Sequence, residues 1–193
     1  MKKISMAGTL VAICLTAGGA WAQTMPVYES TGTVELVIDG DRSTHHTTFN
    51  TVPNQPGRRV DTARWRLSAP MMMGGINIAP PGVLVTLSSR PAIEPHSSLP
   101  ELKITFSLDE NDHALLKSPP FQVSYIVKEG PLAGEYQHAS GALQILSVTP
   151  AGDDVLKITG RAAGTLNATK KDRQGSGAGL GYAADFSVDA YRF

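Results

Sequence analysis

Two histidines and three methionines are the side chains of this sequence best suited to bind a metal ion. His45 and His46 are adjacent, and Met71, Met72 and Met73 form one unbroken run. Thioether sulfur suits Cu(I), and imidazole is a common copper ligand. Together these residues predict a copper-type metal site as one function for the chain.

A structural interpretation of the same residues stands beside this one. Methionine is flexible and unbranched, so a run such as Met71–Met73 also fills irregular gaps beneath a loop rich in proline and glycine. His45 and His46 fall in a predicted strand, where neighbouring side chains point to opposite faces. Each histidine would therefore need further ligands from elsewhere in the chain.

Two other patterns contain groups that could bind a ligand. The turn Asp109–Asp112 is rich in oxygen and could contact a hard cation such as Ca²⁺, but it lacks the glycine and the distal glutamate of an EF-hand loop. Asp and Asn are also common turn formers. The glycine-rich run Gly175–Gly181 would need a strand before it and a helix after it to bind phosphate. Strands are expected on both sides, so we interpret it as a hairpin loop.

Hydrolytic chemistry has no signature in the sequence. Neither a G-x-S-x-G nor an H-E-x-x-H motif is present. Ser140 lies two residues after His138, but closeness in sequence does not make a catalytic dyad. No catalytic residue is predicted, and an enzyme whose site forms only in the folded chain is kept as an alternative.

The elements that must position these side chains are strands. The last third of the chain predicts three in succession, Ala142–Thr149, Val155–Thr169 and Gly181–Phe193. In the third, apolar Phe186 and Val188 alternate with polar residues, which is the two-residue period of a half-buried strand.

The first two thirds predict seven further strands separated by turn residues. Asp39-Gly40 marks a tight hairpin turn between the first two. The predicted ranges are Thr33–Asp39, Ser43–Thr51, Arg58–Ser68, Gly75–Ala79, Val83–Ser88, Leu102–Leu108 and Phe121–Val127. His113–Lys117 could form one helical turn, and Pro131–Ala139 is ambiguous. The pattern predicts an all-β fold, an antiparallel β-sandwich of about nine or ten short strands, with a small closed β-barrel as the alternative.

The beginning of the chain resembles a secretory signal peptide. Residues 1–22 have a basic start and an apolar stretch, and Ala20 and Ala22 place small residues where signal peptidase acts. Cleavage is expected before Gln23, leaving residues 23–193 as a single all-β domain without a transmembrane segment. The signal is of a bacterial type, so we expect a periplasmic or extracellular protein of a Gram-negative bacterium.

The cysteine count and the charge balance of the sequence exclude several classes of function. The only cysteine, Cys14, leaves with the predicted signal, so the mature chain has no disulfide and no thiol chemistry. Lys2 and Lys3 leave as well, so 15 basic residues remain against 17 acidic ones. This balance gives no basic footprint for nucleic acid.

These observations favour an exported, non-catalytic β-sandwich that binds another exported protein or an envelope component. No cofactor is predicted for that function. A periplasmic copper-type protein using the histidines and methionines above, and an enzyme, are the two alternatives.

Overall fold

The computed structural model describes residues 27–51, 59–73, 76–79, 81–94, 98–117, 120–169 and 179–193. Within these ranges every regular element is a β-strand. The strands are β1 (Tyr28–Ile38), β2 (Asp41–Thr51), β3 (Arg59–Asp61), β4 (Ala63–Ser68), β5 (Met71–Met73), β6 (Ile76–Ala79), β7 (Gly82–Ser89), β8 (Glu101–Asp109), β9 (Gln122–Val127), β10 (Gly134–Pro150), β11 (Val155–Ala168) and β12 (Leu180–Arg192).

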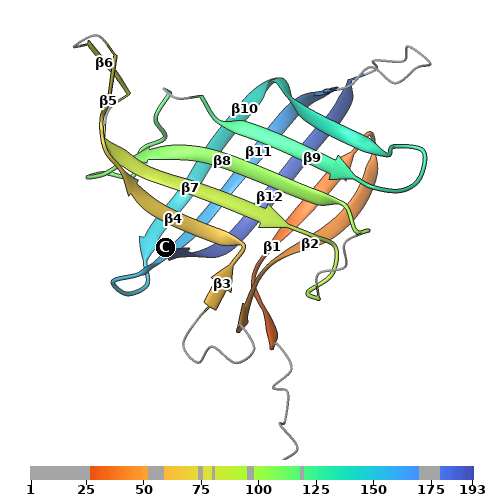
Figure 1. Ribbon diagram of the computed structural model, residues 1–193, viewed down its shortest axis with the longest axis horizontal. Coiled ribbons are helices and arrows are strands. Elements are labelled where there is room, and N and C mark those ends of the chain that lie inside the picture. The colour runs from red at the N-terminus through yellow and green to blue at the C-terminus, as the bar shows by residue number, and fades with distance from the viewer. Residues whose placement is uncertain are drawn as a thin grey trace, which may run out of the picture.

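The strands form two crossing layers. One continuous sheet has the order β11-β10-β9-β8-β7-β4-β12-β1-β2-β3, and β5 and β6 form a separate hairpin. Figure 1 shows β4, β7, β8 and β9 side by side in front, crossing over β11, β12, β1 and β2 behind them. The predicted all-β fold is confirmed, and one continuous sheet forms both of its packed layers.

β10 is the strand that joins the two layers. Its first residues, Gly134–Gln137, pair with β9, while Tyr136–Pro150 pair with β11. Ala139 and Leu146 interrupt the regular register with β11, and such bulges bend a strand and increase its twist. β10 can therefore run beside β9 at the front and then continue behind it (Figure 1).

A short parallel contact on the other side closes seven of the strands into a ring. β11 pairs with both β10 and β12, and β12 pairs with β4 through Tyr191–Arg64 and Arg192–Trp65. The Trp65 ring nitrogen also donates to the Asp154 carbonyl at 3.2 Å. All the other strand pairings are antiparallel.

The hydrophobic core lies between the layers. Phe106 of β8 and Phe186 of β12 meet across it with ring centroids 6.3 Å apart. Both are almost fully buried, as are Val34, Leu36, Ile104, Leu108, Ile158, Leu166, Val188 and Ala190. The alternation expected along β12 is confirmed, because Phe186, Val188 and Ala190 are buried while the aspartates and the serine between and before them face outward.

The Asp39-Gly40 turn is also confirmed. Asp39 has a φ of 47° and Gly40 a φ of 96°, the backbone shape that a two-residue hairpin with the right-handed strand twist requires. β1 and β2 then pair from Ile38–Asp41 to Tyr28–Asn50.

The structure differs from the sequence-based expectation at four places. β10 runs from Gly134 to Pro150, well beyond the predicted Ala142–Thr149, because the ambiguous residues before Ser140 continue it. The predicted strand Arg58–Ser68 is divided at Thr62. Met71–Met73, expected in a loop, form a strand. No helical turn forms at residues 113–117, where Leu115 makes a β-bridge with Leu108 instead.

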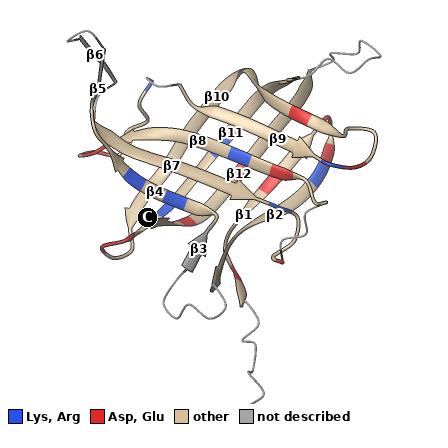
Figure 2. Ribbon diagram, in the orientation of Figure 1, with Lys and Arg blue, Asp and Glu red and all other residues tan. Residues whose placement is uncertain are grey.

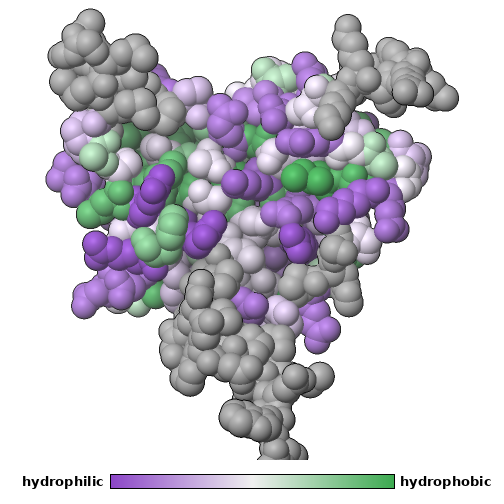
Figure 3. Space-filling model, in the orientation of Figure 1, coloured by the Kyte–Doolittle hydropathy of each residue, from purple (hydrophilic) through white to green (hydrophobic). Residues whose placement is uncertain are grey.

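Charges of both signs are interspersed along the strands (Figure 2). The face seen in Figure 3 carries scattered apolar patches separated by polar residues. Among the residues that the structure covers, none belongs to a helix long and apolar enough to cross a membrane. The predicted signal, residues 1–22, and its cleavage position before Gln23 lie outside the described residues.

Candidate functional site

The second half of β10 has a strand on only one of its edges. β9 ends its pairing with β10 at Gln137, and among the strands that the structure describes the residues of β10 beyond that point pair only with β11. A groove of about 400 Å³ lies against the other edge. We call it the β10 groove, and its walls are residues 143–148 on one side and residues 112–115 on the other.

The wall formed by residues 112–115 is held in place by β8. The Asp109 amide donates to the Ala114 carbonyl and the Leu116 amide donates to the Ser107 carbonyl, each at 2.8 Å. This segment therefore occupies the edge of β8 beyond the end of β9. Its backbone hydrogen bonds go to β8 and not to β10, which leaves the groove between them.

The β10 wall is uncharged and partly apolar. Residues 142–149 contain no charged side chain. Leu146, the extra residue of a bulge, is 52% exposed, while Ile145 and Val148 are partly buried against the core. Natural edge strands commonly carry a lysine or a proline that discourages pairing with another chain. Here a proline stands only at the end of the strand, at Pro150.

A second, more enclosed cavity lies where β2 meets the end of β7. It encloses about 170 Å³, and we call it the His46 pocket. Alternate residues of β2 share one face, so His46, Thr48 and Asn50 line it together. The other lining residues are Tyr28, Thr62, Ser88, Arg90, Ala92 and Ile93.

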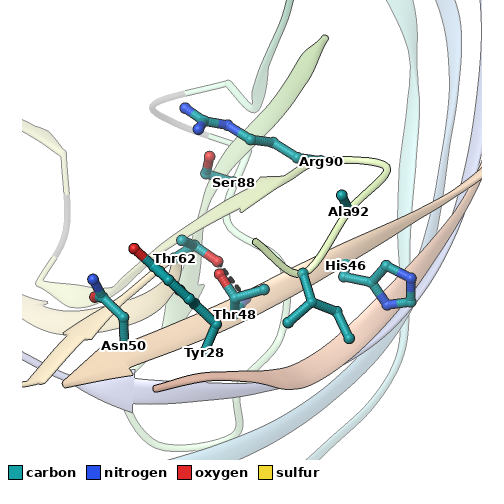
Figure 4. Close-up of a pocket in the computed structure, with 9 residues that line it drawn as sticks. Tyr28, His46, Thr48, Asn50, Thr62, Ser88, Arg90 and Ala92 are labelled. Atoms are coloured by element: carbon teal, nitrogen blue, oxygen red, sulfur yellow. Dashed lines mark hydrogen bonds between the residues drawn. The ribbon is translucent and has the colours of Figure 1, made fainter. Parts of the chain in front are cut away.

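Backbone hydrogen bonds fix the geometry of this pocket. His46 and Arg90 form a β-bridge, with the His46 amide 2.6 Å from the Arg90 carbonyl. The Thr48 amide donates to the Thr62 hydroxyl at 2.7 Å, and the Ser88 amide donates to the Thr62 carbonyl at 2.8 Å. Figure 4 shows these residues, with the Thr48–Thr62 bond as a dashed line.

Arg90, the arginine among the described lining residues, is already paired. Arg90 Nη2 lies 2.6 Å from Glu101 Oε2, and the Ser88 hydroxyl donates to Glu101 Oε1 at 2.5 Å. Burial raises the pKa of the Glu101 carboxyl, but the bonds from Ser88 and Arg90 outweigh it and hold the pKa below its ordinary value. Glu101 is thus held as an ionised partner of Arg90, which does not suit the role of a proton donor.

The two predicted metal-binding histidines have different environments. His45 is 1% exposed, and its Nδ1 lies 3.3 Å from the Ser89 carbonyl. Desolvation lowers the pKa of the His45 ring, with a smaller contribution from His46 in the same direction. His46 lines the pocket, and its buried Nδ1 has no hydrogen-bond partner among the residues placed by the structure.

The methionine run is not brought near these histidines. Met71–Met73 form β5, which lies between β4 and the start of β7, whereas His46 bridges Arg90 at the end of β7. β7 spans Gly82–Ser89, so the two places are separated by roughly 25 Å of strand. Figure 1 shows the β5–β6 hairpin far from β2. Within the described ranges no group of three His, Cys, Asp or Glu side chains is arranged to hold a metal.

The acidic turn has a structural role. Asp109 Oδ1 accepts hydrogen bonds from the backbone amides of Asn111 and Asp112, at 2.8 and 3.3 Å. These bonds lower the pKa of the Asp109 carboxyl. A structural role in the turn therefore accounts for the Asp109 carboxylate. Most of the glycine-rich run, residues 175–178, lies outside the described residues.

Sequence reasoning missed both cavities for identifiable reasons. The polar residues of β2 alternate at 46, 48 and 50, and this spacing could have indicated a common face. The adjacent histidines instead suggested a metal site. The open edge of β10 had a weaker signal, the long uncharged run of residues 142–149. Nothing in the sequence indicated that β9 would end before covering it.

Comparisons of the chain with protein-family profiles, curated protein sequences and solved structures find no significant match. The function must therefore be argued from the two cavities themselves.

Proposed function

We propose that this chain is an exported, non-catalytic binding protein, and that it binds an extended segment of another exported or envelope protein along the free edge of β10. The observation that carries the proposal is the edge of β10 beyond Gln137 that faces the β10 groove, because no described strand pairs with it.

A free strand edge can bind an extended peptide and fix its orientation. Along an antiparallel strand, about every second residue turns its N–H and C=O away from the existing neighbour. An added strand pairs with these groups through main-chain hydrogen bonds, and its alternate side chains enter adjacent pockets. In the β10 groove, Leu115 and Leu143 provide apolar surface for those side chains.

The shape of the groove favours a slender partner over a second folded copy of this chain. Residues 112–115 form a second wall beside the edge, and they are fixed to β8 by backbone hydrogen bonds. A single extended peptide needs only the space of one strand. A second copy would have to bring its own β10 and the attached layers past this wall.

The uncharged edge also defines the chemistry of the partner. Cross-strand neighbours contact each other directly, and a charge placed against an apolar side chain loses solvation without gaining a partner. We therefore expect the bound segment to be uncharged at its centre and to alternate apolar with small polar residues. Asp112 and His113 belong to the opposite wall, where they can contact charged flanking residues of the partner.

A selection from a random peptide library tests this function. We expect the selected peptides to be uncharged and alternating, and the Leu146→Lys variant to bind them at least about tenfold more weakly because it introduces a charge at the edge. Leu146 is 52% exposed, so the substitution does not disturb the core. Leu132→Lys is the matched control, since Leu132 is also exposed but lies outside the groove.

Hydrogen exchange locates the bound peptide. The amides of residues 142–149 should gain protection when the peptide is added. The proposal is wrong if no selected peptide depends on Leu146, or if the protein alone is a dimer with these amides already protected, which would identify a second copy as the occupant.

Export is tested separately by intact mass. A mature chain that begins at Gln23 in the periplasm or medium supports it, and a cytoplasmic chain that retains residues 1–22 contradicts it.

A further inference from the structure

We propose that the His46 pocket is a second binding site, for a single neutral, polyhydroxylated unit such as one sugar ring of a glycan. The pocket shares no lining residue with the β10 groove, so the inference is independent of the proposed function. Four features of the pocket carry it: size, hydrogen-bonding capacity, charge and apolar surface.

The size of the pocket suits a small ligand. A water molecule takes about 30 Å³ in the liquid, so a cavity of 170 Å³ corresponds to roughly five or six waters. Pockets for drug-sized ligands start at about 300 Å³. The cavity is therefore large enough for one small ring and too small for an extended molecule.

The walls offer both donors and acceptors. The Thr62 hydroxyl accepts from the Thr48 amide, and its own hydrogen has no acceptor among the described residues, so it can be donated to a ligand. The Ser88 hydroxyl donates to Glu101 and keeps a lone pair to accept. Asn50 adds an amide group that can do both. A ligand with several hydroxyl groups matches such a mixed set, because each hydroxyl can donate and accept.

A buried nitrogen on the wall adds to this capacity. His46 Nδ1 is shielded from solvent and makes no hydrogen bond to any residue that the structure places. A buried polar atom without a partner is unfavourable, and a hydroxyl brought in by a ligand would remove that cost.

The charge of the pocket favours a neutral ligand over an anion. Among the lining residues that the structure describes, Arg90 alone carries a full charge, and it forms an ion pair with Glu101. An anion that approached Arg90 would also approach the Glu101 carboxylate, which lies 2.6 Å from the guanidinium. The pair therefore offers hydrogen bonds without net attraction for either sign of charge.

Apolar surface completes the site. Ala92 and Ile93 follow β7 and line the pocket together with the ring of Tyr28. In Figure 4, Tyr28, Thr48, Asn50 and Thr62 gather at one side, with His46 and Ala92 at the other. A sugar ring has polar edges and an apolar C–H face, so it can contact Tyr28 and Ile93 while its hydroxyls contact the polar groups.

NMR titration of the full chain with glucose, galactose and N-acetylglucosamine tests the proposal, with glucuronate and inorganic phosphate as charged probes. We expect saturable shifts of β2 and β7 amides for at least one neutral sugar. Asn50→Ala and Tyr28→Leu should each weaken binding at least about fivefold, because each removes one class of contact. Asn167→Ala, an exposed exchange of the same kind on β11, should bind as the unmodified protein does.

The outcomes separate the alternatives. Tighter binding of glucuronate or phosphate would overturn a neutral site in favour of an anion site. Absence of saturable shifts with all three sugars would overturn the proposal as well. Retained spectral dispersion in Asn50→Ala and Tyr28→Leu shows that each variant is folded, so a loss of binding reports on the pocket.

Discussion

At the scale of single residues, the two adjacent histidines show that strand geometry can separate side chains that are neighbours in the sequence. His45 points into the core and His46 lines a pocket, so they do not act on one ligand together. Because His45 is buried, its protonation should lower the free energy of unfolding. Its neutral ring is buried, with Nδ1 near the Ser89 carbonyl, so Nδ1 carries the hydrogen.

We predict that the protein becomes less stable as the pH falls below 6.5, the ordinary pKa of histidine. The folded state holds the pKa of His45 below this value, so the unfolded chain binds more protons there, and stability decreases by up to about 1.4 kcal/mol per pH unit until the folded-state pKa is reached. Denaturant unfolding from about pH 8 to about pH 5 measures it. Burial also lowers the pKa of His138, which contributes in the same direction.

The variant His45→Asn isolates the contribution of His45. Asparagine can still donate to the Ser89 carbonyl but does not titrate, so the dependence of stability on pH should become shallower. His113→Asn exchanges the same residue types in a surface turn and is the control; residue 113 has a φ of 57°, which asparagine tolerates. An unchanged dependence in His45→Asn would show that His45 does not titrate on unfolding.

At the scale of elements, β10 has the largest effect on the architecture, because it belongs to both layers. Its bend lies near Gly141, which has a φ of 149° and pairs with Gly164 of β11. A Cβ atom on Gly164 would collide with the Ser140 carbonyl. Two glycines face each other here because the two backbones approach too closely for a side chain.

We predict that Gly164→Ala destabilises the fold by about 1–3 kcal/mol, the range for forcing extra atoms into a filled space. The neighbour in the way is backbone, which cannot rotate aside as a side chain can. Gly134→Ala is the control, since its nearest atom would be 3.6 Å away, an ordinary contact. Its effect should stay within about 0.5 kcal/mol. Equal midpoints of denaturant unfolding for the two variants would contradict this account of the bend.

At the scale of the whole molecule, the seven-strand ring depends on the short parallel contact between β4 and β12. Only two residue pairs join these strands. Trp65 strengthens the contact from the β4 side, because its ring nitrogen bonds to Asp154 and its ring lies 5.4 Å from the Arg192 guanidinium. The Phe193 amide also donates to the Trp65 carbonyl.

We predict that Trp65→Phe opens this contact before the rest of the molecule. Loss of the indole hydrogen bond removes one of two donors to the Asp154 carbonyl, which keeps the Arg192 amide at 2.8 Å, and should cost about 0.5–1.5 kcal/mol. The amides of β4 should exchange with solvent faster, while those of β8, in the middle of the front layer, should change little. Tyr125→Phe is the control. It removes the hydroxyl of another buried aromatic residue, one that lies outside this contact. Uniform acceleration in both strands would show that the ring opens only by global unfolding.

The sequence by itself determined the elements and their inner faces. The alternation at Phe186 and Val188 identified the buried side of β12, and Asp39-Gly40 identified a hairpin, because both signals depend on residues close together in the chain. The same local signals were enough to predict an all-β fold with two packed layers.

Only the tertiary structure decided which distant segments meet. The contact of Trp65 with Arg192, the end of β9 before β10 is covered, and the assembly of the His46 pocket from β1, β2, β7 and the residues beside them were not indicated by any local pattern. An alternating pattern records which face of a strand is apolar, but it does not record the partner of each edge. That choice depends on the packing of both layers together and on closing the long loops between them.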